Sequence, residues 1–259
     1  MLCEIKIKMI KKITNNITKY GYFETLKKII FYPYNFYLYK KKRNFLNLKN
    51  AKDRFTEIYK TNYWNNEESV SGPGSTIEIT ENLRSKLPIV LKKYNINTIL
   101  DAPCGDFNWM KLFLADNKLT KYIGGDIVPE IIKKNNQLYK NNAVTFVELD
   151  IIKESLPECD LMICRDCLIH FSYKDISNFL KNFCNSPIKY LLVTNFRFKN
   201  NSHSSNRDII TGDHRVIDLM AKPFNFPSPL FSIKEKDEQN LGSVHMELFD
   251  KSQLSSIKN

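Results

Sequence analysis

The sequence lacks any long apolar stretch. Its longest apolar runs, such as residues 161–164 and 190–193, are far shorter than the ~20 residues that a membrane-spanning helix needs. The N-terminus is charged throughout and shows neither the apolar core nor the small-residue cleavage site of a secretory signal. We therefore expect a cytoplasmic protein, and 42% hydrophobic and 12% aromatic residues suit a globular core. A chain of 259 residues can hold one large α/β domain, with or without a small appendage.

The cysteines lack the spacing of a disulfide framework. The chain has six, and most fall in apolar, strand-like segments, which indicates a reducing compartment. Cys159, Cys164, Cys167 and His170 include a C-x-x-C pair and could be drawn as a zinc site. Because Cys164 falls at the end of an expected buried strand and no second C-x-x-C is present, we predict no metal site.

The positive charge is missing from most of the chain. Residues 1–50 hold 12 Lys and Arg against 2 Glu, a net charge of +10 out of the total of +11. The remaining 27 basic and 26 acidic residues leave the body at +1. The body does not repeat the basic pattern of residues 1–50. We therefore predict no nucleic-acid partner.

Residues 1–50 form a basic, aromatic-rich N-terminal extension, and residues 51–259 form the main domain. Ile10, Ile13 and Ile17 recur at helical spacing with lysines between them. The extension either packs its aromatic side chains on the body and solvates its lysines, or contacts a partner or an anionic membrane. The second option predicts a peripheral protein at the inner membrane surface. The sequence leaves the oligomeric state open.

Strand-like and helix-like segments alternate after residue 75. A capping box of Ser75 and Glu78 predicts a helix that ends near Tyr94. The expected strands are residues 98–101, 122–126, 144–150, 160–164 and 190–194, with a final pair at 230–234 and 244–249. This order predicts an α/β fold with a Rossmann-like, mostly parallel seven-stranded sheet, helices on both faces and an antiparallel C-terminal hairpin. Residues 197–229 read as a polar insertion.

Successive expected strands end in Asp101, Asp126 and Asp150. In a parallel sheet the three carboxylates share the carboxyl edge, where such folds bind ligands. Asp126 follows Gly105 by 21 residues, close to the ~20 expected for an acid that accepts hydrogen bonds from both hydroxyls of a ribose. Gly105 allows the backbone to approach the ligand closely. Turn formation or helix capping by these Asp residues is the structural alternative.

Four segments resemble the ordered motifs of class I S-adenosylmethionine (SAM)-dependent methyltransferases: residues 99–106, 125–127, 149–151 and 160–171. The resemblance covers about residues 75–250. Residues 103–109, 164–170 and 223–227 are similar to a subgroup found among surface-polysaccharide biosynthesis genes. One departure is that Pro103 and Phe107 stand where the family has glycines, so we expect a stiffer turn.

The resemblance implies a SAM cofactor and a role for each matching residue. Asp101 would lie by the methionine ammonium, Asp126 would hold the ribose hydroxyls, and Asp150 with Ile151 would flank the adenine. Gly105 would lie under the cofactor, and the backbone of Cys164 would face the methionine. The implied cofactor-binding residues are Asp101, Ala102, Pro103, Cys104, Gly105, Asp126, Ile127, Asp150, Ile151 and Cys164.

Methyl transfer is an in-line displacement that depends on positioning and on the exclusion of water. An oxygen or nitrogen nucleophile can also need a base, for which His170 and Asp166 are the first candidates. Asp106, Asp213 and His214 are weaker ones. We expect O-methylation of a small-molecule or glycan-linked acceptor, in surface-polysaccharide modification, with acceptor selection by residues 51–74 and 197–229.

Three other functions stay open. A nicotinamide-dependent oxidoreductase is disfavoured because the G-x-G-x-x-G turn is missing. A methyltransferase-like, non-catalytic binding protein could dock on a membrane or a partner through residues 1–50. An RNA or protein methyltransferase is the third alternative.

Overall fold

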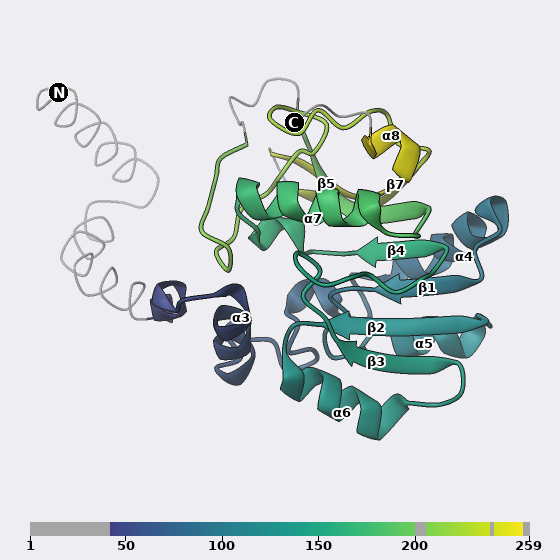
Figure 1. The fold of residues 1–259 in the computed structure, drawn as a ribbon, viewed down its shortest axis with the longest axis horizontal. Helices are drawn as coiled ribbons and strands as arrows, with labels where there is room; N and C mark the ends of the chain where they lie inside the picture. The colour runs from purple at the N-terminus through teal and green to yellow at the C-terminus, as the bar shows by residue number, and fades with distance from the viewer. Residues whose placement is uncertain (1–41, 200–205, 239–240, 256–259) are drawn as a thin grey trace, which may run out of the picture. The chain divides into compact units, whose positions relative to one another are not determined.

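The computed structural model describes residues 42–199, 206–238 and 241–255 (Figure 1). The chain divides into two compact units, Met1–Asn44 and Phe45–Asn259, and all that follows concerns the second. Nearly all of the basic extension, including Ile10, Ile13 and Ile17 with their helical spacing, lies outside the described residues. The structure of that extension and its membrane contact therefore stay predictions.

Within the described ranges, a seven-stranded sheet organises the second unit, in the order β3-β2-β1-β4-β5-β7-β6. Strands β1 to β5 are parallel, and β7 runs antiparallel to both β5 and β6. The bounds are β1 Thr98–Asp101, β2 Lys121–Asp126, β3 Val144–Glu148, β4 Leu161–Cys164, β5 Tyr190–Phe198, β6 Phe231–Glu238 and β7 Gly242–Asp250. The predicted fold class is confirmed. The chain reverses its winding direction between β1 and β4, which is where such sheets bind ligands.

Helices cover both faces of the sheet (Figure 1). Neighbouring residues of β1 point to opposite faces, so Ile99 packs with Leu83 of α4 while Leu100 packs with Phe179 of α7. The helices are α3 Ala51–Lys60, α4 Glu81–Tyr94, α5 Met110–Asp116, α6 Pro129–Tyr139, α7 Tyr173–Asn185 and α8 Lys251–Ser255. Short 3-10 turns are η1 Asn44–Asn47, η2 Pro73–Ser75 and η3 Leu168–His170. None of the described helices has the length and apolar character that crossing a membrane requires.

The start of α4 differs from the prediction. The helix begins at Glu81, after Thr80, and Ser75 instead ends the 3-10 turn η2, so the predicted capping box is wrong. The physical reason is a competing contact, because the carboxylate of Glu68 accepts the backbone N–H of Ile77 at 2.7 Å. The predicted end at Tyr94 is confirmed, and Asn95 closes the helix in the left-handed conformation at φ 52°.

Four strands differ from their expected bounds by two residues or more: β3, β5, β6, which continues past residue 234 to Glu238, and β7, which begins at Gly242. Strand β3 ends at Glu148, so Asp150 follows the strand rather than ending it. Strand β5 continues past residue 194 to Phe198, because it pairs with β7 from Tyr190 opposite Asp250 to Phe198 opposite Gly242. Pairing with β7 accounts for the extra length of β5, and no pattern within β5 itself indicates it.

The prediction of a polar insertion at residues 197–229 is wrong. Its first residues belong to β5, and its described part buries apolar side chains, namely Ile209, Ile217, Leu219, Phe224 and Phe226. Four of these, all except Ile209, join the core cluster beneath α7. Because its apolar residues follow neither helical nor strand periodicity, their burial has no signature in the sequence.

Candidate functional site

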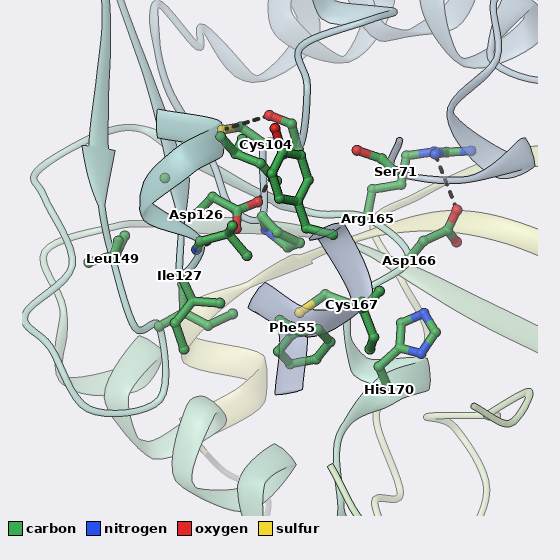
Figure 2. A pocket seen from close by; sticks show the side chains of 18 of the residues that line it. Phe55, Ser71, Cys104, Asp126, Ile127, Leu149, Arg165, Asp166, Cys167 and His170 are labelled. Atoms are coloured by element: carbon green, nitrogen blue, oxygen red, sulfur yellow. Dashed lines mark hydrogen bonds and ion pairs between the residues drawn. The ribbon is translucent and has the colours of Figure 1, made fainter. Parts of the chain in front are cut away.

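A pocket of about 1100 Å³, partly open to solvent, lies at the carboxyl edge of the sheet (Figure 2). Asp101, Asp126 and Asp150 all line it, so the structure brings together the three acids that the sequence placed at this edge. Pro103, Cys104, Gly105, Ile127 and Ile151 also line it. Ala102 and Cys164 are fully buried and lie outside the lining.

Asp101 is 2% exposed at the end of β1. The hydroxyl of Tyr122 donates a hydrogen bond of 2.7 Å to its Oδ2. Burial raises the pKa of Asp101 to about 7, although the Tyr122 hydroxyl and the charge of Arg165 act in the opposite direction. At neutral pH Asp101 therefore exchanges between its protonated and ionised forms. A cation or a hydrogen-bond donor that approaches it favours the ionised form.

Asp126 ends β2 and is 5% exposed. Its Oδ2 accepts the N–H of Gly105 at 3.1 Å and its Oδ1 accepts the N–H of Val128 at 3.0 Å. Burial raises its pKa to about 6 against these backbone hydrogen bonds. A carboxylate can accept about four hydrogen bonds, so both oxygens keep capacity for ligand hydroxyls.

The turn after β1 accommodates its unusual residues through packing. Phe107 adopts a left-handed conformation, φ 60°, and its ring packs on Tyr122, Tyr139 and Phe146 with centroids 5.3, 5.1 and 5.0 Å away. It is buried and does not line the pocket. Aromatic contacts in the core thus hold a conformation that favours glycine.

Asp106 holds a covering segment in place. Residues 69–75, here called the strap, contribute Val70, Ser71 and Ser75 to the pocket lining. The Asp106 carboxylate accepts hydrogen bonds from Ser69 Oγ at 2.9 Å, Val70 N–H at 3.0 Å and Ser71 Oγ at 3.3 Å. Because Asp106 does not line the pocket, its role is to tie the strap to the turn, not to act as a base.

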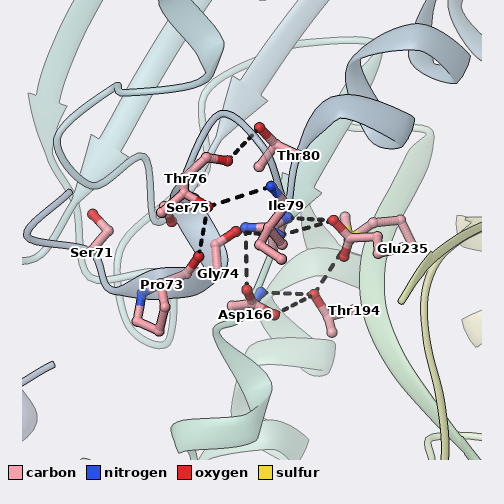
Figure 3. Close-up of polar contacts among 12 residues, drawn as sticks. Ser71, Pro73, Gly74, Ser75, Thr76, Ile79, Thr80, Asp166, Thr194 and Glu235 are labelled. Atoms are coloured by element: carbon pink, nitrogen blue, oxygen red, sulfur yellow. Dashed lines mark hydrogen bonds and ion pairs between the residues drawn. The ribbon is translucent and has the colours of Figure 1, made fainter. Parts of the chain in front are cut away.

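Arg165 fixes the other end of the strap (Figure 3). Its Nη2 donates to the carbonyl of Gly74 at 2.8 Å, and its Nε donates to Glu235 Oε1 at 2.9 Å. Its Nη1 lies 3.2 Å from Asp166 Oδ2. Sequence reasoning missed Arg165 as a site residue, since its partner Glu235 comes from β6, 70 residues away.

The pocket is electrostatically negative. Its described lining holds the carboxylates Asp101, Asp126, Asp150 and Asp166 against one permanent cation, Arg165. Arg165 is already paired with Glu235 and Asp166, and Lys153 pairs with Asp150 at 2.9 Å. Asp101 and Asp126 form no ion pair among the described residues, so the pocket favours a ligand that carries positive charge and hydroxyl groups.

The two predicted catalytic residues, Asp166 and His170, both line the pocket. Asp166 has φ 50°, and its N–H donates to Thr194 Oγ1 at 2.7 Å. His170 ends η3, and its ring lies 4.8 Å from the ring of Trp64. Burial lowers the pKa of His170 to about 4, so its imidazole is neutral at pH 7.

Helix α3 and the segment after it form one wall of the pocket. No helix was predicted there from the sequence. Phe55, Ile58 and Tyr59 of α3 line the pocket, as does Trp64. The side chain of Asn50 caps the helix by accepting the Asp53 N–H at 2.9 Å. The signals were an Asn N-cap and apolar residues three and four positions apart. The described part of residues 197–229 does not line the pocket, whereas residues 51–74 do, as expected.

No family model matches this sequence, and no curated protein matches it. The fold is similar to that of a SAM-dependent methyltransferase from Leishmania major, with 15% identity, TM-score 0.55, and coverage of 78% of this chain and 87% of that one. It is also similar to the N-methyltransferase NodS from Bradyrhizobium japonicum WM9 in complex with S-adenosylhomocysteine (SAH), with 12% identity, TM-score 0.54, and coverage of 74% and 97%. A third similar structure is the methyltransferase domain of bacterial CtHen1, with 16% identity, TM-score 0.50, and coverage of 66% and 99%. At these identities the likeness shows the fold, and the predicted class I methyltransferase fold is confirmed.

Proposed function

We propose that this protein is a SAM-dependent methyltransferase that methylates oxygen on a small-molecule or glycan-linked acceptor in surface-polysaccharide modification. The observation that carries the proposal is a pair of buried carboxyl groups, Asp101 and Asp126, which have no ion-pair partner among the described residues and lie in a negative pocket at the carboxyl edge of a methyltransferase fold. SAM bears an ammonium group, ribose hydroxyls and a sulfonium, and it would supply an electrophilic methyl group when bound.

The chemistry of the lining fits this cofactor. Asp101 would accept the ammonium group, and Asp126 has acceptor capacity for the ribose hydroxyls beyond its two backbone hydrogen bonds. The apolar side chains of Ile127, Leu149 and Ile151 line the pocket and would contact a flat base.

A dinucleotide cofactor fits less well. A pyrophosphate is bound by free N–H groups at a helix N-terminus directly after the first strand. Here β1 ends at Asp101 but α5 begins only at Met110, and the intervening turn carries Asp106. Negative charge on the ligand would add to that of the lining, which favours SAM over a nicotinamide dinucleotide.

The acceptor half of the pocket supports a ring-shaped substrate. Phe55, Tyr59 and Trp64 line the pocket, and their ring faces suit the apolar side of a sugar ring. The five described cysteines, Cys104, Cys159, Cys164, Cys167 and Cys184, are free, which supports a reducing cytoplasm. The basic residues 1–50 support additional contact with the anionic inner membrane surface.

Calorimetric titration with SAM, SAH and NAD⁺ tests the cofactor. We expect binding of SAM and SAH and no binding of NAD⁺, and the reverse preference would contradict the proposal. Transfer of tritium from methyl-labelled SAM to fractions of polysaccharide precursors tests the reaction. SAM binding with no transfer to any sugar, nucleotide or peptide acceptor would favour the non-catalytic binding protein.

A further inference from the structure

Residues 211–215 run along the turn that carries His170. The N–H of Gly212 donates to the His170 carbonyl at 2.8 Å, and the N–H of Arg215 donates to the Ile169 carbonyl at 3.1 Å. The hydroxyl of Thr211 accepts the Ser172 N–H at 2.9 Å. We call residues 211–215 the clamp segment, because these bonds fix the backbone of η3 on both sides of His170.

The clamp segment also fixes the imidazole itself. His170 Nδ1 lies 2.8 Å from the backbone carbonyl oxygen of Asp213. A carbonyl oxygen can only accept, so Nδ1 carries the hydrogen. In a neutral imidazole ring Nε2 is then unprotonated, and its lone pair can accept a proton. The His170 side chain lines the pocket.

Arg215 secures this arrangement from inside the protein. It is 3% exposed, and its Nη1 and Nη2 donate to the carbonyls of Leu168 and Phe171 at 2.5 and 2.7 Å. These carbonyls flank His170, so the guanidinium joins the clamp segment to both ends of the turn. Its positive charge also opposes protonation of the nearby ring.

We propose that the clamp segment, with Arg215 as its positioning residue, holds His170 as the Nδ1–H tautomer so that Nε2 accepts the proton of a hydroxyl acceptor. This inference rests on the proposed function. The acceptor O–H bond breaks and its proton moves to Nε2, while the oxygen electron pair forms the new C–O bond. The electrons of the broken S–C bond stay on sulfur, and the imidazolium then returns its proton to water.

The charged groups around His170 set its protonation. Asp166 and the Asp213 carbonyl favour the imidazolium, whereas His214, Arg215 and burial oppose it. Phe55 and Trp64 contact the ring at centroid distances of 6.4 and 4.8 Å and cover part of it, so that the side chain is only partly exposed. The balance keeps the ring neutral, so its base form is present throughout the physiological range.

Nitrogen NMR of the full-length, ¹⁵N-labelled protein tests the inference without an acceptor. The chain has 4 histidines, so the signals of His170 can be assigned by its substitution. We expect protonated Nδ1 and unprotonated Nε2 at pH 7, with titration only near pH 4. A protonated Nε2 with bare Nδ1, or an imidazolium at pH 7, would overturn the proposal.

Arginine variants separate positioning from general stability. Arg215→Met should mix the two tautomers and raise the His170 pKa, and Arg215→Lys should restore part of the wild-type spectrum. Arg84→Met is the matched control, because Arg84 is a partly buried arginine whose described hydrogen bonds go to Ile77 and Thr80, outside the clamp segment. A wild-type His170 spectrum in folded Arg215→Met would contradict the positioning role. If that variant does not fold, the His170 spectrum of Arg215→Lys and the tautomer found in the wild-type protein test the proposal instead.

Calorimetry distinguishes a failed inference from a failed function. His170→Asn keeps a donor for the Asp213 carbonyl but has no basic nitrogen, and it should bind SAM with unchanged affinity. If the wild-type protein does not bind SAM, the proposed function fails, whatever the tautomer. If SAM binds and the tautomer is the opposite one, only the inference fails.

Discussion

At the scale of single residues, two carboxylic acids near neutrality define the site. Asp101 and Asp126 have pKa values of about 7 and 6 because burial disfavours their ionised forms. A ligand that brings an ammonium group and hydroxyls interacts with the ionised forms. Ligand binding and proton release from these two residues are therefore coupled.

This coupling gives a pH dependence with a defined sign. Both acids have raised pKa values, so protons occupy them as the pH falls through 7 and 6, and a cationic ligand must displace those protons. We expect the SAM affinity to be highest above pH 7 and to fall by up to about tenfold for each pH unit and each protonated acid. Calorimetry from pH 8 to pH 5 measures it, and an affinity that does not change with pH would contradict the assignment.

Asp126→Ala tests the ribose contact. Loss of hydrogen bonds to a charged group is worth about 1.5–3 kcal/mol, so SAM affinity should fall at least about tenfold, to the limit of detection if both hydroxyls are lost. Asp116→Ala is the control, because Asp116 is exposed at the end of α5. Circular dichroism should report an intact fold for both, and unchanged affinity in Asp126→Ala would exclude the contact.

At the scale of elements, the strap depends on one carboxylate. Asp106→Ala removes the acceptor shared by Ser69, Val70 and Ser71. We expect a loss of about 1–3 kcal/mol in the free energy of unfolding and faster hydrogen exchange at residues 69–75. Exchange measured by mass spectrometry checks it. Protection equal to that of wild type would show that other contacts hold the strap.

Elements with local signals were predictable, and those with distant partners were not. The strands that end at Asp101 and Asp126 carry their own apolar pattern and terminal acid, so their place at the carboxyl edge followed from the sequence. The strap did not, because the Asp106 carboxylate that holds it comes 35 to 37 residues later. Nor did the start of α4, which the hydrogen bond from Ile77 to Glu68 displaces. The capping box at Ser75 was a valid local signal that this contact overrode.

At the scale of the whole molecule, Arg165 connects parts that are far apart in the chain. It joins the end of β4 to Gly74 of the strap and to Glu235 of β6. Arg165 lies within the segment 160–171 that carried the family resemblance, but the resemblance assigned it no role, and neither Gly74 nor Glu235 belongs to a motif. The fold class and the site acids could be predicted, but the strand order and the charge network that closes the site required the structure.

Arg165→Met tests the importance of this network. It leaves Glu235, with a side chain that is 2% exposed, without its cation. Breaking a buried ion pair in this way costs about 3–5 kcal/mol, so the midpoint of thermal unfolding should fall clearly. Lys236→Met, which removes an exposed charge from the adjacent position, should leave the midpoint nearly unchanged. Equal midpoints for the two variants would contradict the assigned role.

Helix α3 has a consequence for how new substrate ranges can arise. It joins the body through the Lys52–Glu148 pair, the Lys60–Glu130 pair at 3.3 Å and a hydrogen bond from Arg54 to the Thr211 carbonyl. Two of its pocket-lining side chains, Phe55 and Tyr59, are only partly buried, so they can be exchanged with little loss of core packing. Side chains at these positions can therefore change while Asp101 and Asp126 stay unchanged. If the proposed function holds, a library randomised at positions 55 and 59 would alter the choice of acceptor and leave the affinity for SAM intact.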